Sequence, residues 1–111
     1  MSDLAKKRCM PCEGGAKPLT PDQAQEIMGQ LSPEWMLIDQ CRMLARTFPF
    51  KNFKDALEFA NRIGAIAEEE NHHPDLTISW GALGVELSTH AMQGLSENDF
   101  ILASKIDQIK L

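Results

Sequence analysis

The three histidines are the residues of this sequence best suited to chemistry. His72, His73 and His90 all lie between positions 68 and 99, and each stands where a predicted helix or strand ends. Two carboxylates belong to the same stretch, Glu68 just before the histidine pair and Asp99 after the third histidine. Imidazole titrates near pH ~6.5, so two differently placed histidines can give and take a proton in one turnover. The stretch therefore predicts an acid–base site without a covalent intermediate.

The adjacent histidines are expected to point in different directions. A helix that runs to about Asn71 would place Glu68 and His72 on one face at its C-terminal end, where the carboxylate and the helix dipole both favour imidazolium. His73 precedes Pro74, and a residue before proline is restricted to extended geometry. The two imidazoles can then take separate roles.

Other interpretations of the histidines stay open at this point. A His-His-Pro sequence after a helix is as typical of a polar C-terminal cap as of a catalytic feature. Three histidines with acids can also bind zinc, but adjacent histidines seldom point to one ion and the sequence has no His-x-His or His-x3-His pair. A metal site is therefore disfavoured.

Length and composition predict one globular domain. The chain has 111 residues and 43% hydrophobic content, enough for a single core without structural disulfides or metals. Its net charge of −5 provides no broad phosphate-binding surface, which argues against direct nucleic-acid binding. No apolar run approaches the roughly 18 residues of a membrane span, and no signal-peptide core follows Met1. A cytoplasmic location away from membranes is expected.

Residues 1–18 are predicted to form an extended N-terminal arm, followed by a folded domain over residues 19–111. The arm carries a CxxC motif, Cys9-Met10-Pro11-Cys12, and the glycine pair after it breaks regular structure. No second CxxC follows, so an incidental or minor structural use is favoured over redox chemistry or shared metal binding. Three cysteines without an export signal argue against a disulfide framework, and Cys41 is expected to be a small buried residue.

The first helix is predicted from its capping residues. Thr20 is a good N-cap, Pro21 occupies the first helical position, and Gln23 completes a capping box. The apolar pattern continues to Leu31, and Ser32-Pro33 is expected to end the helix.

Two further helices follow from apolar periodicity. From Asn52 a wide apolar stripe predicts a long helix packed on a sheet, formed by Phe53, Ala56, Leu57, Phe59, Ala60, Ile63, Gly64, Ile66 and Ala67. The last helix is predicted to begin after Ser96 as N-cap, with Asp99 at the third helical position.

Two predicted hairpins separate these helices. Residues 35–38 and 41–48 form the first, although Arg42 and Arg46 share parity with its apolar residues, and residues 75–80 and 85–89 form the second. By the same parity, Trp80 is favoured as a core residue over a stacking platform for a ligand. The pattern predicts an α+β fold of order αββαββα, with three helices on one face of a four-stranded antiparallel sheet. Such a sheet can bring the histidines and acids around one cleft.

The spaced motifs resemble those of the pterin-4a-carbinolamine dehydratase family. The resemblance covers approximately residues 19–109, and the Cys-Met-Pro-Cys-Glu-Gly-Gly arm is similar to that of bacterial and plant-type members. It rests on Glu68-x3-His72-His73-Pro74, on the spacing to Trp80, His90 and Asp99, and on the runs Leu87-Ser88-Thr89-His90, Gly94-Leu95-Ser96-Glu97-Asn98-Asp99 and Leu102-Ala103-Ser104.

The resemblance implies dehydration of 4a-hydroxytetrahydropterin to quinonoid dihydropterin, which recycles the cofactor of aromatic amino-acid hydroxylases. Pterin is then the substrate, and neither a metal nor an organic cofactor is implied. The implied site comprises catalytic His72, His73 and His90, supported by Glu68, Pro74, Trp80 and Asp99. Within it we assign His72 and His90 to proton transfer and His73 to holding the substrate hydroxyl or ring.

The resemblance also bears on partners. Many animal members have arginine immediately before the last-helix aspartate, where this chain has Asn98, so a cationic contact at the site mouth is expected to be missing. A homodimer or homotetramer is implied, and the exposed edges of a small sheet also favour such assembly. A pterin-binding protein without catalysis, or a dimerisation and coactivator-type interaction protein, is the alternative function.

Overall fold

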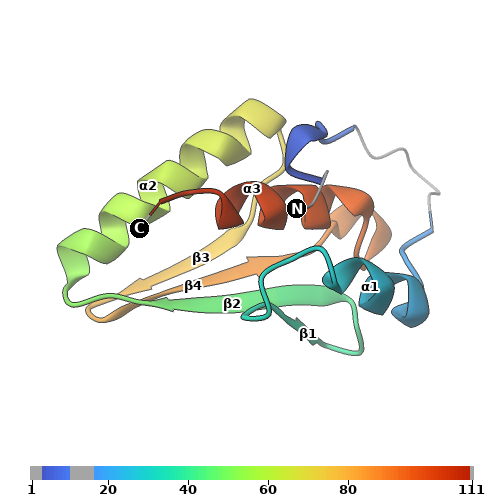
Figure 1. The fold of residues 1–111 in the computed structure, drawn as a ribbon, viewed down its shortest axis with the longest axis horizontal. Helices are drawn as coiled ribbons and strands as arrows, with labels where there is room; N and C mark the ends of the chain where they lie inside the picture. Colours follow the sequence, from blue (N-terminus) through green and yellow to red (C-terminus); the bar gives the residue numbers. More distant parts are fainter. Residues whose placement is uncertain (1–3, 11–16, 111) are drawn as a thin grey trace.

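The computed structural model describes residues 4–10 and 17–110, which form two layers, a sheet with helices on one side (Figure 1). Apart from two short 3-10 helices, the elements follow the predicted order αββαββα. They are η1 (Leu4–Lys6), α1 (Pro21–Met28), β1 (Met36–Ile38), β2 (Met43–Pro49), α2 (Phe53–Glu70), β3 (Asp75–Ser79), β4 (Ala82–Leu87), η2 (His90–Met92) and α3 (Glu97–Asp107).

The four strands form one antiparallel sheet in the order β1-β2-β4-β3. Each predicted hairpin is present, and β2 pairs with β4 to join them at the centre of the sheet. In the central pair Leu44 lies opposite Leu87 at one end, and Pro49 lies opposite Ala82 at the other. The sheet therefore has the predicted α+β architecture, with the exits of α2 and β4 at the same end as the start of α3 (Figure 1).

The core fills the space between the helices and the inner face of the sheet. It is formed mainly by Leu44, Phe48, Phe59, Ile63, Leu83, Val85, Leu87, Leu95, Phe100, Ile101, Leu102 and Ile106. Arg46 belongs to the same inward-facing set as Leu44 and Phe48, which explains its unexpected parity in the sequence. Its guanidinium binds the carboxylate of Asp107 on α3 at 2.8 Å, so the inward charge is neutralised.

Two helix predictions need correction at their ends. The first helix begins with the predicted Thr20 capping box but ends at Met28, not at Ser32. Gly29 has low helical propensity, and the chain continues to Leu31 through 3-10-type backbone hydrogen bonds, which still bury the Leu31 side chain. In α2 the buried stripe is centred on Ile63, so Phe53 and Leu57 lie at its margin and are exposed.

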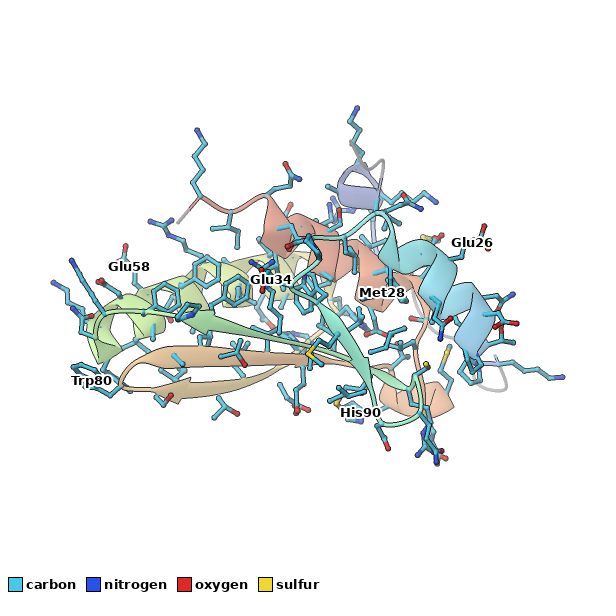
Figure 2. The ribbon with its side chains drawn as sticks, turned by 60° about the horizontal axis from the view of Figure 1, so that its bottom comes forward. Glu26, Met28, Glu34, Glu58, Trp80 and His90 are labelled. Atoms are coloured by element: carbon cyan, nitrogen blue, oxygen red, sulfur yellow. The ribbon has the colours of Figure 1, made fainter. Side chains whose placement is uncertain are left out.

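Trp80 is not a core residue. Strand β3 ends at Ser79 and β4 already begins at Ala82, so Trp80 occupies the two-residue turn between them. Strand alternation no longer applies in a turn, and the side chain is 71% exposed. Figure 2 shows Trp80 well away from His90, and the two residues lie beyond opposite ends of β4. Cys41 likewise lies in a turn, between β1 and β2 with a φ of 63°, and is only half-buried.

The described part of the N-terminal arm packs on the domain. Leu4 is buried in the common core, and η1 contacts α3. Lys105 on α3 donates a hydrogen bond to the Ala5 carbonyl at 2.8 Å. Cys12, and with it half of the CxxC motif, lies outside the described residues, and the domain boundary at residue 18 stays a prediction. None of the described helices is both long enough and apolar enough to cross a membrane.

Candidate functional site

A cavity of about 430 Å³ opens where α2, β4, α3 and the N-terminal arm meet. All three histidines line it, and this volume is within the range of small-molecule sites, about 300–1,000 Å³. The lining comes from four separate segments of the chain: residues 9–10, 70–73 and 88–90, together with Asn98. The predicted convergence of the histidines is therefore present.

The end of α2 directs the two adjacent histidines. The helix stops at Glu70, and Asn71 adopts a left-handed conformation with a φ of 53°, which asparagine tolerates better than most residues. The N–H of His72 donates to the carbonyl of Ala67 at 3.2 Å, which closes the helix terminus. Because the chain turns at Asn71, His72 is not one helical turn from Glu68, and the predicted contact between them is wrong.

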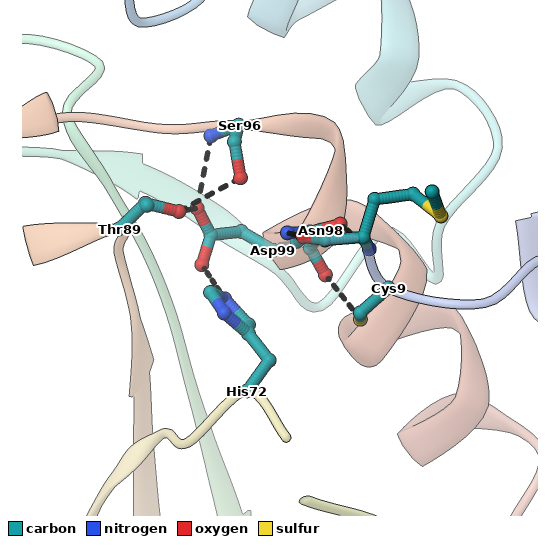
Figure 3. A network of polar contacts seen from close by, with 7 residues as sticks. Cys9, His72, Thr89, Ser96, Asn98 and Asp99 are labelled. Atoms are coloured by element: carbon teal, nitrogen blue, oxygen red, sulfur yellow. Dashed lines mark hydrogen bonds and ion pairs between the residues drawn. The ribbon is translucent and has the colours of Figure 1, made fainter. Parts of the chain in front are cut away.

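His72 instead contacts Asp99 in the first turn of α3. The two side chains are joined by a hydrogen bond of 2.6 Å between Nε2 and Oδ1, and Asp99 is completely buried. The other carboxylate oxygen of Asp99 accepts bonds from the Thr89 hydroxyl at 2.8 Å and the Ser96 N–H at 3.0 Å (Figure 3). Asp99 is thus held by Thr89, which follows β4, and by Ser96, the N-cap of its own helix, and it can fix the orientation of the His72 ring.

His73 has a separate carboxylate partner. Its Nε2 is hydrogen-bonded to Glu68 on the last turns of α2, and both side chains are largely exposed, by 52% and 78%. Pro74 follows, half-buried at the start of β3, and does not line the cavity. The two adjacent imidazoles therefore differ in environment, one bonded to a buried acid and the other to an exposed acid.

His90 contributes the third imidazole, from the segment that follows β4. It begins η2 directly after Thr89, whose N–H donates to the Gly94 carbonyl at 2.7 Å. The side chain of His90 is exposed at the cavity (Figure 2). The structure does not bring Trp80 to this cavity. Among the described residues, no group of three or more His, Cys, Asp or Glu side chains is arranged to hold a metal ion.

Glu70 is a site residue that sequence reasoning missed. It is the last residue of α2 and only 7% exposed, and its carboxylate accepts the Cys9 N–H at 2.8 Å. Burial by itself raises the pKa of Glu70. The Cys9 hydrogen bond and the positive charges of Lys105 and Arg8 lower it by more than burial raises it, so the pKa lies below its ordinary value. Only its place among three consecutive glutamates could have drawn attention to it, because its partners are distant in sequence.

Asn98 is the second residue whose part was not foreseen. It is buried, and its side-chain amide pairs with the backbone of Met10 in both directions, accepting at 2.9 Å and donating at 2.6 Å. Cys9 and Met10 therefore form one wall of the cavity. The sequence had suggested only that a cationic contact was absent at position 98.

Fold and cavity together define a small α+β domain with a cavity lined by three imidazoles. Residues 17–109 match the family model of pterin 4 alpha carbinolamine dehydratase, and the chain belongs to this family.

Similar proteins support the assignment over the whole chain. A relative from Rubrobacter xylanophilus, provisionally named a pterin-4-alpha-carbinolamine dehydratase, is 45% identical over 98% of this chain and 100% of its own length. Another with the same provisional name, from Rickettsia canadensis, is 49% identical over 96% of this chain and 97% of its own.

Solved structures share the fold. A transcriptional coactivator/pterin dehydratase from Brucella melitensis matches with a TM-score of 0.74 and 30% identity, over 81% of this chain and 95% of that one. A pterin dehydratase-like protein identified as a RuBisCO assembly factor in the alpha-carboxysome matches with a TM-score of 0.56 over 67% of this chain and 86% of its own. At 20% identity it shows likeness of fold alone.

Proposed function

We propose that this protein dehydrates 4a-hydroxytetrahydropterin to quinonoid dihydropterin and water. The observation that carries the proposal is the convergence of three imidazoles on one cavity, with His72 bonded to the buried carboxylate of Asp99. Family membership supplies the substrate class. The reaction needs one proton donor and one acceptor, which histidines can supply near neutral pH.

In the proposed reaction the N5 lone pair of the pterin forms the C4a=N5 double bond while the C4a–O bond breaks. The leaving hydroxyl takes up one proton and departs as water, and N5 loses its own proton. The Asp99 carboxylate can accept only the Nε2–H of His72, which leaves Nδ1 of the neutral ring with the free lone pair. We therefore assign His72 as the base at N5.

The remaining histidines act on the hydroxyl side of the substrate. His90 lines the same cavity and is exposed, and it is assigned as the proton donor to the leaving hydroxyl. His73, bonded to Glu68, is assigned to hold the hydroxyl or the ring. This division follows from the two imidazole environments, because the ring bonded to buried Asp99 is restrained more strongly than the exposed ones.

The test is to add purified protein to freshly made carbinolamine and to follow quinonoid dihydropterin by absorbance. We expect the wild type to accelerate its formation, and His72→Ala and His90→Ala to lose most of the acceleration. Gln25→Ala, at an exposed position of α1, is the control that retains it. A wild-type rate equal to that of buffer would overturn the proposal.

The name of the Brucella melitensis structure also favours a second candidate, a coactivator-type interaction function.

We propose in addition a homodimer or homotetramer, and an aromatic amino-acid hydroxylase as the source of the carbinolamine. Light scattering on the purified protein tests the subunit number. If the protein acts only through a partner, His72→Ala should still bind that partner. If it acts as a dehydratase, His72→Ala should lose most of the acceleration in the carbinolamine assay.

A further inference from the structure

We infer that Asn98 and Glu70 hold residues 4–10, the N-terminal wall, in a position where Cys9 and Met10 form part of the pterin-binding surface and set its affinity. The inference rests on the proposed function and extends it from the histidines to a segment with no role in proton transfer. It assigns Asn98 and Glu70 as positioning residues, because they act through the backbone of Cys9 and Met10 and not through a reacting atom.

The first anchor is the amide of Asn98. Its Oδ1 accepts the Met10 N–H at 2.9 Å while its Nδ2 donates to the Met10 carbonyl at 2.6 Å, so both the N–H and the carbonyl of Met10 are hydrogen-bonded. An amide is the side-chain group that can both accept and donate in this way. The buried position of Asn98 makes the pairing more than a surface contact, since a lost bond would leave polar groups unpaired.

The second anchor is the carboxylate of Glu70, from the other helix. It accepts the Cys9 N–H at 2.8 Å and lies 3.7 Å from the ammonium of Lys105. Lys105 in turn donates to the Ala5 carbonyl at 2.8 Å, which ties the same charge network to the start of the segment. Helices α2 and α3 therefore bind the N-terminal wall together, next to the imidazoles that α2 delivers.

A third contact fixes the wall at its far end. Leu4 is buried in the common core, so the segment is held at both ends and not only at the cavity. The backbone groups of Cys9 and Met10 that face α2 and α3 are hydrogen-bonded, and both residues line the cavity. Small-molecule sites bury most of the ligand surface, and this wall supplies one side of the enclosure. Its loss should weaken binding more than it slows chemistry, because the histidines lie on other elements.

The decisive experiment uses the full-length protein and the variant Asn98→Ala, with Lys7→Gln as the matched control. Lys7 belongs to the same segment and reaches the same helix through an exposed ion pair with Glu97 at 3.2 Å, away from the cavity lining. Hydrogen–deuterium exchange of residues 4–10 reports wall docking. The dissociation constant for 7,8-dihydrobiopterin reports pterin affinity, and kcat and KM are measured separately.

In Asn98→Ala we expect faster exchange at Cys9 and Met10, together with a dissociation constant and KM raised roughly five- to tenfold, the size of a lost hydrogen-bonded contact. The value of kcat should stay within about twofold, and Lys7→Gln should resemble the wild type in every readout. Glu70→Ala, on α2, should raise the dissociation constant and KM in the same way as Asn98→Ala on α3. It tests the inference even if Asn98→Ala fails to fold.

Two results would overturn the inference alone: unchanged exchange in both anchor variants, or faster exchange with unchanged pterin affinity. In each case wild-type protein still binds pterin and dehydrates the carbinolamine. Wild-type protein that does neither would overturn the proposed function as well, so the two failures are distinguishable.

Discussion

The Nε2 atom of His72 lies 2.6 Å from Oδ1 of Asp99, although 27 positions separate the two residues in the chain. One residue follows the end of α2, and the other belongs to the first turn of α3. The sheet brings these ends together at the exit of β4, where Thr89 donates to the same carboxylate. The contact combines a capping interaction with the orientation of an imidazole, so one aspartate serves both the fold and the site.

Replacement of Asp99 by asparagine should impair turnover far more than binding. The amide would present an N–H to His72 and favour the other tautomer, so we expect kcat to fall roughly 100-fold or more, as with other carboxylates that fix a catalytic imidazole. KM should change little. Asp107→Asn is the same aspartate-to-asparagine substitution at the C-terminal end of α3, away from the cavity, and should retain turnover. Equal losses in both variants would contradict this role.

The pair formed by Glu68 and His73 should contribute little to stability. Both side chains are largely exposed, and exposed ion pairs contribute about 0–1 kcal/mol. We expect Glu68→Gln to change the free energy of unfolding by less than ~1 kcal/mol while raising KM a few-fold. Urea denaturation and steady-state kinetics measure the two quantities, with Glu69→Gln as the neighbouring control. A kcat loss as large as that of Asp99→Asn would place Glu68 in the proton transfer itself.

The pair formed by Arg46 and Asp107 should matter for stability and not for the site. Its side chains are only about 15% exposed, and the same carboxylate accepts the Trp35 Nε1–H at 2.7 Å and the Ser32 N–H at 2.9 Å. Asp107→Asn leaves an inward-facing guanidinium without its counter-charge and should cost about 2–4 kcal/mol.

The exposed pair of Arg42 and Asp39 offers a matched comparison for this cost. Asp39→Asn removes a similar aspartate–arginine contact and should cost below ~1 kcal/mol. Urea denaturation of the two variants measures the difference, and similar costs would show that burial of the Arg46 pair adds nothing.

Docking of the N-terminal wall should weaken in acid. Because the pKa of Glu70 lies below its ordinary 4.5 in the folded protein, ionised Glu70 stabilises the folded state above about pH 4.5. That contribution disappears as the pH falls through the lowered pKa. The charged groups around it are Lys105 and Arg8, and His72 and His73 line the same cavity.

The protection of the Cys9 N–H, taken relative to its intrinsic exchange rate at each pH from 7 down to 3, should therefore fall at the acidic end in the wild type. Glu70→Gln, which keeps an acceptor but cannot ionise, should lose the acidic transition. A wild-type profile identical to that of Glu70→Gln would exclude this carboxylate as the cause.

Bound pterin should protect one cysteine selectively from alkylation. Cys9 lines the cavity, whereas Cys41 lies in the turn between β1 and β2. With iodoacetamide and fragment mass spectrometry, we expect 7,8-dihydrobiopterin to slow modification of Cys9 several-fold and to leave Cys41 unchanged, because only Cys9 would be covered by the ligand. Equal protection of both thiols would indicate a general change in the protein and not a ligand at this site.

Much of the fold follows from local sequence patterns. The capping residues Thr20 and Ser96 begin their helices as predicted, because an N-cap depends on residues within one turn. The two hairpins also follow from short-range alternation. The errors arose where such patterns end: Trp80 was assigned to the core by extending strand parity into a turn, and Glu68 was paired with His72 by extending the helix beyond its last residue.

By itself, the sequence determined the order of the elements, the family and the three histidines that could share a site, because each depends on residue type and nearby spacing. Only the tertiary structure decided which carboxylate each imidazole meets, and that Glu70 and Asn98 bind the N-terminal wall. Those contacts join residues as far apart as 88 positions, so they depend on how the helices pack over the sheet. The left-handed Asn71 turns the chain at the end of α2, and Glu68 contacts His73 instead of His72.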